Sequence, residues 1–487
     1  MNRRTFIHAA GATGLGLTSR FDFGATDRAV AVLLDLLEDS PRERIPRELV
    51  RMIRAGLRYE DLLLAVALAA VRNVQPYPDV GFKYHSVMML RSIHLTTQHL
   101  SSSDKWLPIA WATDYFKDTQ AQERDTDGWR LPTRAAAPAG TPRAARHALI
   151  AALDNWDRDA ADAAIVNYAQ AARQDEIFSL LFRYGARDLR AIGHKAIAVT
   201  NAHCLIELLG SAQAEAILRS TVAALQNSGA GPNPATHDLQ PDQPWRQSLK
   251  RLHEIPQNWK QGRNDLGARA ELHAALYRVS EQESGTVIIE LLQQGISPDA
   301  IWQVLFDTAA ELVMHEPGIV SLHAQTTANA LYYAYRVCGD EQTQQVTLLQ
   351  CASFMAMFRK LVGTTQPDLS LEALQPLPLD SSAVDAIDEI FADVADGRRL
   401  QAARKSLGYL QTGGDAEALI ARARHHLVYN ADEPHDYKFS EAVFDSYAHL
   451  SNSAWRWRFL SSGMAYFNAP AKRPGPVVEQ MLERLRA

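Results

Sequence analysis

Four of the sixteen histidines stand at the start of segments in which apolar residues recur with helical spacing. These residues are His85, His194, His323 and His435. A single histidine is more often a structural residue of intermediate burial than a ligand. Four equivalent histidines would converge if their helices packed around a common centre, and neutral imidazole is the commonest metal ligand in proteins. The recurrence therefore predicts one metal site that all four side chains share.

Lys438 lies three residues after His435, which places both side chains on one face of a helix. Two interpretations are open for this lysine. It is either a solvated surface residue or a metal ligand. As a ligand it must lose its positive charge, and carboxylation of the amine to a carbamate would remove the charge and supply an oxygen donor.

Several polar residues follow two of the histidines by one or two helical turns and could orient ligands or face a substrate. They are Asn201, His203, Thr326, Thr327 and Asn329. For each of them taken singly, hydrogen bonding between helices is the favoured interpretation. His94 and His99 follow His85 but have no counterparts after the other three histidines, so they rank below it.

The four histidines belong to an internal repeat. Such a repeat indicates one array of similar helical units and not several unrelated domains. In each copy an acidic start precedes an apolar helix, a break follows, and a histidine opens the next helix. The acidic starts lie at Glu60-Asp61, Asp175-Glu176, Asp299 and Glu417. The pattern predicts a single all-α catalytic domain over residues 26–487, built from about four helix-pair repeats around a central metal site.

Composition narrows the range of partners. The net charge of -6 supplies no basic surface for phosphate, so nucleic acid is not an expected partner. No apolar run reaches the roughly 18 residues that a membrane-spanning helix needs, and we therefore expect no membrane span. The three cysteines lack the spacing of a zinc or redox motif, so each is expected to be a small buried residue.

The first residues carry an arginine pair, Arg3-Arg4, followed by Phe6, Ile7 and a short apolar stretch. This pattern is typical of a twin-arginine export signal over residues 1–25, which would engage the twin-arginine export machinery and place the protein in the periplasm. The alternative is a frayed basic N-terminus on a cytoplasmic protein.

The chain resembles the questin oxidase family at four stretches between about Met52 and Leu450. They are His85 heading an apolar helix, the His194 helix ending in Glu207-Leu208, the run His323-Ala324-Gln325-Thr326-Thr327, and the spacing His435-x-x-Lys438. Members of this family cleave or oxygenate polycyclic quinones without haem or flavin. The resemblance implies a non-haem iron held by His85, His194, His323, His435 and a carboxylated Lys438. The chain lacks the family's second, closely spaced histidine in the second stretch, so the substrate does not transfer.

The leading functional hypothesis is a metal-dependent oxidoreductase. We expect a non-haem iron oxygenase that uses dioxygen as co-substrate and acts on an aromatic or polycyclic small molecule. A histidine-rich set favours iron, or alternatively zinc or copper, over magnesium and calcium. Two alternatives remain: a helical-repeat scaffold without catalysis, and a zinc-dependent hydrolase. The hydrolase would need a carboxylate base, for which Glu207, Asp432 and Glu433 are the nominal candidates.

Overall fold

All regular structure in the described part of the chain is helical. The computed structural model describes residues 27–76, 82–126, 128–133, 140–363, 369–380, 386–450, 454–467 and 475–486. Within these ranges the only bridge between extended segments joins Arg263 to Ile296. The all-α prediction is therefore confirmed. The export signal predicted for residues 1–25 lies outside the described residues.

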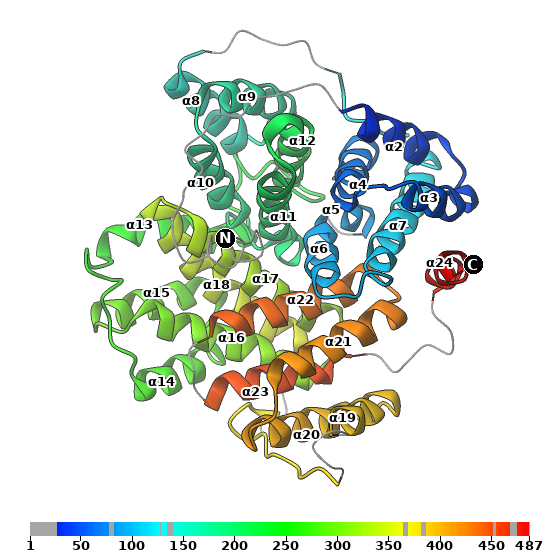
Figure 1. Cartoon of the computed structure of the whole chain (residues 1–487). Helices are drawn as coiled ribbons and strands as arrows, with labels where there is room; N and C mark the ends of the chain where they lie inside the picture. The colour runs from blue at the N-terminus through cyan, green and yellow to red at the C-terminus, as the bar shows by residue number, and fades with distance from the viewer. Residues whose placement is uncertain are drawn as a thin grey trace.

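The helices follow one another in four groups, which Figure 1 shows in sequence from blue to red. The first group comprises α2 (Arg28–Asp39), α3 (Ile45–Arg54), α4 (Tyr59–Asn73), α5 (His85–Met88), α6 (Leu90–Gln98) and α7 (Trp106–Arg124). The second group comprises α8 (Pro142–Asp154), α9 (Arg158–Ala171), α10 (Gln174–Gly185), α11 (His194–Leu209) and α12 (Ala214–Leu225). The third group comprises α13 (Gln243–Arg251), α14 (Leu266–Leu276), α15 (Glu281–Gln293), α16 (Pro298–His315), α17 (Ile319–Val337) and α18 (Glu341–Val362). The fourth group comprises α19 (Ala386–Ala395), α20 (Arg399–Gln411), α21 (Ala416–Asn430), α22 (Pro434–His449) and α23 (Ala454–Ser462), and α24 (Pro476–Arg486) follows it.

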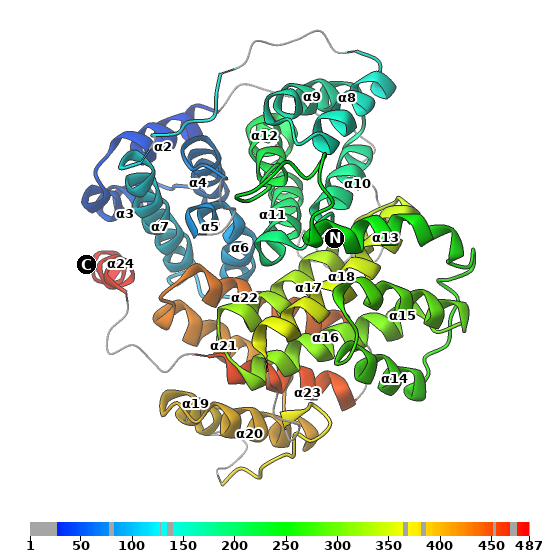
Figure 2. The same ribbon diagram turned by 180° about the vertical axis from the view of Figure 1, so that it is seen from behind.

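One helix from each group forms a closed inner ring. Helix α6 packs against α11 and α22, and α17 packs against both α11 and α22. Figures 1 and 2 show these inner helices meeting where the four groups come together. In this ring, 12 of the 16 residues of α11 and 13 of the 16 residues of α22 are buried. A helix that is apolar or buried on all sides lies in the interior of a large protein, so the ring is the core on which the outer helices pack.

The predicted repeat corresponds to the inner helices and the helices that precede them. Helices α4, α10, α16 and α21 come directly before the four inner segments, and a third helix, absent from the predicted pair, follows each segment as α7, α12, α18 or α23. Polar caps fix where the outer helices begin. For example, the side chains of Ser297 and Asp157 accept hydrogen bonds from backbone N–H groups in the first turns of α16 and α9.

The histidines do not all open their helices. His85 and His194 are the first residues of α5 and α11, and His435 is the second residue of α22. His323 instead lies one turn inside α17, which corrects the prediction for the third copy. The reason is local, because the hydroxyl of Ser321 accepts a hydrogen bond from the Gly318 N–H, and this capping interaction starts the helix at Ile319.

A polar cluster joins all four inner helices beyond the histidines. Arg91 of α6 pairs with Asp445 of α22 at 2.9 Å, and the Asn329 amide of α17 donates to the same carboxylate at 2.8 Å. Asn201 of α11 accepts a hydrogen bond from the Arg91 backbone N–H at 3.2 Å. Asn201 and Asn329 therefore form hydrogen bonds between helices. This is the role that the sequence favoured for each residue.

The C-terminal helix returns to the beginning of the chain. Helix α24 packs against α3 and α7, and Figure 1 shows it beside the first helices. Val477, Val478 and Met481 are its buried residues. None of the described helices is long and apolar enough to cross a membrane.

Candidate metal centre

The ring of inner helices brings the four predicted histidines together. One ligand atom from each of His85, His194, His323 and His435 lies within 4.8 Å of the other three. All four residues are buried, with no more than 8% of any one exposed. The imidazoles form a closed cycle in which neighbouring ring centroids are 4.4 to 4.9 Å apart. This buried group could hold a metal ion.

The nitrogen spacing fits the coordination of one transition ion. The Nε2 atom of His194 lies 2.9 Å from Nε2 of His323 and 3.3 Å from Nε2 of His85. Two imidazole nitrogens bound to one ion, each at about 2.1 Å and at right angles, would be about 3.0 Å apart. The nitrogens therefore already have the separation of neighbouring ligands.

A backbone hydrogen bond orients His323, and a carboxylate lies beside His435. The Nδ1 atom of His323 lies 2.5 Å from the Ile319 carbonyl oxygen, so Nδ1 donates and Nε2 keeps its lone pair toward the cluster. The Nδ1 atom of His435 lies 3.2 Å from Oε2 of Glu433, and this contact lowers the pKa of the Glu433 carboxyl. A carboxylate beside the outer nitrogen is the usual partner of a metal-bound histidine, because it fixes the tautomer and makes the ring a stronger donor.

Burial keeps the imidazoles neutral. It lowers the pKa of His85, His194 and His323 well below the ordinary value, and the nearby Lys438 ammonium lowers each of them further. The pKa of His435 is lowered chiefly by burial as well. A neutral imidazole has the lone pair that a metal requires, so these shifts favour binding over protonation.

Lys438 is buried beside the histidines and is not a surface residue, which excludes the solvated interpretation. Only 3% of the residue is exposed, and its Nζ has no hydrogen-bond partner in the described part of the chain. Burial lowers its pKa to about 7. The Nε2 atom of His435 also lacks a hydrogen-bond partner among the described residues. Unsatisfied buried polar atoms are costly, and a shared ligand at this point would satisfy both, so the donor set fits a metal.

The other polar residues predicted near the site do not join it. The ring of His203 lies 2.8 Å from the Tyr333 hydroxyl, and the Thr326 hydroxyl donates to the His323 carbonyl within its own helix. His94 lies against Tyr59, and His99 is exposed. Neither residue is part of the histidine group. Thr327 is an exception, because it contacts the turn that precedes His194.

Of the three carboxylates considered as catalytic bases, only Glu433 contacts a histidine of the cluster. Glu207 lies thirteen residues beyond His194 in α11, about 20 Å along the helix axis. The backbone N–H of Asp432 donates to Asp436, which also accepts from the Glu433 N–H and so caps α22. The sequence suggested Glu433 as a catalytic base and did not predict its contact with His435.

Replacing Glu433 is expected to weaken metal binding without unfolding the protein. In Glu433→Ala the Nδ1 atom of His435 loses its carboxylate partner, and loss of such a partner typically lowers metal affinity about 10- to 100-fold. Titration with zinc against a competing chelator measures the change. Glu483→Ala, an exposed substitution in α24, is the control. Equal affinity in both variants would remove Glu433 from the site.

Comparison with models of known protein families finds no match, and comparisons with curated proteins and with solved structures find none either.

Proposed function

We propose that this protein is a metal-dependent oxidoreductase, namely a non-haem iron oxygenase that acts with dioxygen on an aromatic small molecule. The observation that carries the proposal is the buried group of four imidazoles on α5, α11, α17 and α22, with the buried Lys438 close enough to lower the pKa of each. A nitrogen-rich set without a cysteine cluster is suited to iron, copper or zinc and unlike a structural zinc site. The questin oxidase resemblance selects iron.

The chain's own residues would hold, orient and shield the metal. The four imidazoles bind it, Ile319 and Glu433 orient His323 and His435, and burial excludes bulk water from the centre. Iron, when bound, would supply the one-electron chemistry that dioxygen requires. We assign no acid or base role to Glu433, because its carboxylate is engaged by His435.

The aromatic substrate is proposed from the questin oxidase resemblance, because members of that family act on polycyclic quinones.

Lys438 is proposed to bind the metal as a carbamate. In this step the lysine amine adds to carbon dioxide, an N–C bond forms, one proton is released, and a carboxylate oxygen becomes available. The buried Nζ, without a hydrogen-bond partner among the described residues, supports the assignment.

Lys438→Met is expected to lower metal affinity by at least about tenfold. Loss of a residue that only orients a ligand typically lowers affinity by this factor, and Lys438→Met removes a proposed ligand itself. Carbon-13 NMR of metal-free and of zinc-loaded protein in labelled bicarbonate should show a carbamate signal that the variant lacks. Retention of both metal affinity and activity by Lys438→Met would exclude the lysine as a ligand.

Oxygen uptake tests the proposed reaction. Iron-loaded protein should consume dioxygen in the presence of a responsive member of a panel of hydroxylated anthraquinones, and His194→Ala protein should not. Uptake that is equal in the two proteins would contradict the proposal. Turnover of ester or amide substrates by zinc-loaded protein would instead favour the hydrolase, and absence of any bound metal would favour the scaffold.

A further inference from the structure

A strained turn immediately precedes His194. Ala191, Ile192 and Gly193 all have left-handed backbone conformations, with φ values of 51°, 42° and 84°. A β-branched residue such as Ile192 very rarely adopts this conformation, and strain of this kind persists only where surrounding contacts enforce it. Elsewhere in the described part of the chain, Trp156 is the one other non-glycine residue with positive φ. The contacts that enforce the turn therefore need an explanation.

On one side the turn is held by Thr327 of α17. Its hydroxyl donates to the Ile192 carbonyl oxygen at 3.2 Å. The Thr327 side chain also fills the space over Gly193, where an added Cβ would lie 2.0 Å from Oγ1 and 2.6 Å from Cγ2. Position 193 therefore requires glycine both for its backbone conformation and for the close approach of Thr327.

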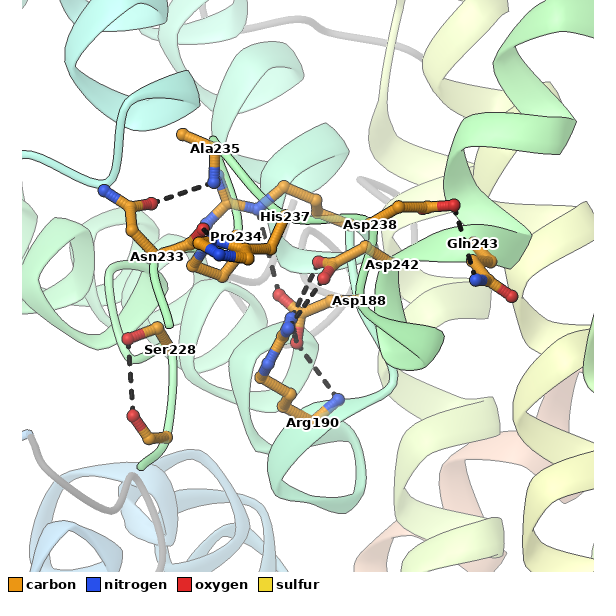
Figure 3. Close-up of polar contacts among 12 residues, drawn as sticks. Asp188, Arg190, Ser228, Asn233, Pro234, Ala235, His237, Asp238, Asp242 and Gln243 are labelled. Atoms are coloured by element: carbon orange, nitrogen blue, oxygen red, sulfur yellow. Dashed lines mark hydrogen bonds and ion pairs between the residues drawn. The ribbon is translucent and has the colours of Figure 1, made fainter. Parts of the chain in front are cut away.

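On the other side the turn is held by buried ion pairs. Arg190 donates two hydrogen bonds to Asp242, at 2.7 and 2.6 Å, and its backbone N–H donates to Asp188 at 3.0 Å (Figure 3). The ammonium of Lys195, the residue after His194, donates to Asp188 at 2.6 Å. The residues before and after the turn are therefore both anchored.

Trp156, the other strained residue, covers this network. The centroid of its ring lies 3.6 Å from the guanidinium carbon of Arg187 and 4.6 Å from the Lys195 Nζ. Both non-glycine sites of positive φ in the described ranges thus belong to one assembly around residues 187–195.

Thr327 connects the turn to His323, the neighbour of His194 in the histidine group. It lies four residues after His323, hence on the same face of α17. The helix that carries His323 therefore also fixes the backbone from which His194 projects, and the two Nε2 atoms are 2.9 Å apart.

We propose that Thr327 is a positioning residue which, by holding the strained turn Ala191–Gly193, sets His194 at ligand distance from His323 before any metal binds. The inference rests on the proposed metal site. It assigns a positioning role to Thr327, which is not one of the proposed ligands.

Cobalt(II) binding to metal-free protein tests this role, because cobalt absorption reports the ligand geometry as well as the affinity. The test variant is Thr327→Val, which keeps the shape of the side chain but cannot donate to Ile192. Thr327→Ser keeps the hydroxyl. The matched control is Thr221→Val in α12, where a buried threonine hydroxyl donates only within its own helix. Gly193→Ala is a second, independent disruption of the turn.

We expect Thr327→Val and Gly193→Ala to bind cobalt about tenfold or more weakly and with an altered visible spectrum. Thr327→Ser and Thr221→Val should both resemble the wild type. Equal affinity and an unchanged spectrum in Thr327→Val would overturn the inference and leave the proposed metal site standing. A similar loss in Thr221→Val would also overturn it, since the effect would then be general destabilisation. Absence of cobalt binding by the wild type would overturn the metal site itself, and with it this inference.

Discussion

His194→Ala and His323→Ala proteins are expected to be purified without the transition metal proposed for the wild type, while their helix content stays close to that of the wild type. Each substitution removes one of the four converging nitrogens, and the two residues have Nε2 atoms only 2.9 Å apart. The helices persist because their stability comes from packing of the surrounding apolar core. Elemental analysis and circular dichroism measure the two properties.

His147→Ala serves as the control for these variants, because His147 is exposed on α8 and distant in sequence from the four proposed ligands. It should retain the full metal content. Full occupancy in either His194→Ala or His323→Ala would defeat the assignment of the four histidines as ligands.

The largest effect on stability is expected at a buried ion pair beside the inner ring. The guanidinium of Arg424 in α21 makes two hydrogen bonds of 2.8 Å to Glu441 in α22, and the Thr96 hydroxyl of α6 donates to the same carboxylate. Only 1% of the Glu441 side chain and 10% of the Arg424 side chain are exposed. Arg424→Met should therefore lower the free energy of unfolding by about 3–5 kcal/mol, because it leaves a buried carboxylate without its counter-charge.

Urea unfolding followed by circular dichroism measures this change. The double variant Arg424→Met/Glu441→Leu should recover much of the loss, since removing both charges also removes their desolvation cost. If Arg424→Met alone costs no more than an exposed pair, about 0–1 kcal/mol, the pair is not a stabilising element of the core.

The fold class and the histidine group were predictable because both depend on repetition. Helical spacing of apolar residues persists through the chain, and it predicted an all-α protein. The recurrence of a histidine after each apolar helix predicted that His85, His194, His323 and His435 would meet, and the structure brings them together. Symmetry of the repeats carries this information even though each motif is weak alone.

Other features of the site have no periodic signature. The left-handed turn at residues 191–193 depends on Thr327 and Asp242, which are remote in sequence, and Ala191 and Ile192 are not residues that typically adopt this conformation. The burial of Lys438 depends on packing around α22, so spacing alone left a surface position open. The packing of α24 against α3 and α7 joins helices that are remote in sequence, and a local pattern does not predict such a contact.

Metal analysis of protein purified without a histidine tag tests the central claim most directly. If the four buried imidazoles form the proposed centre, inductively coupled plasma mass spectrometry should find about one iron per chain, as expected of a single mononuclear site. A preparation that is folded, contains no transition metal and takes up none on incubation with iron(II), zinc(II) or cobalt(II) would contradict it.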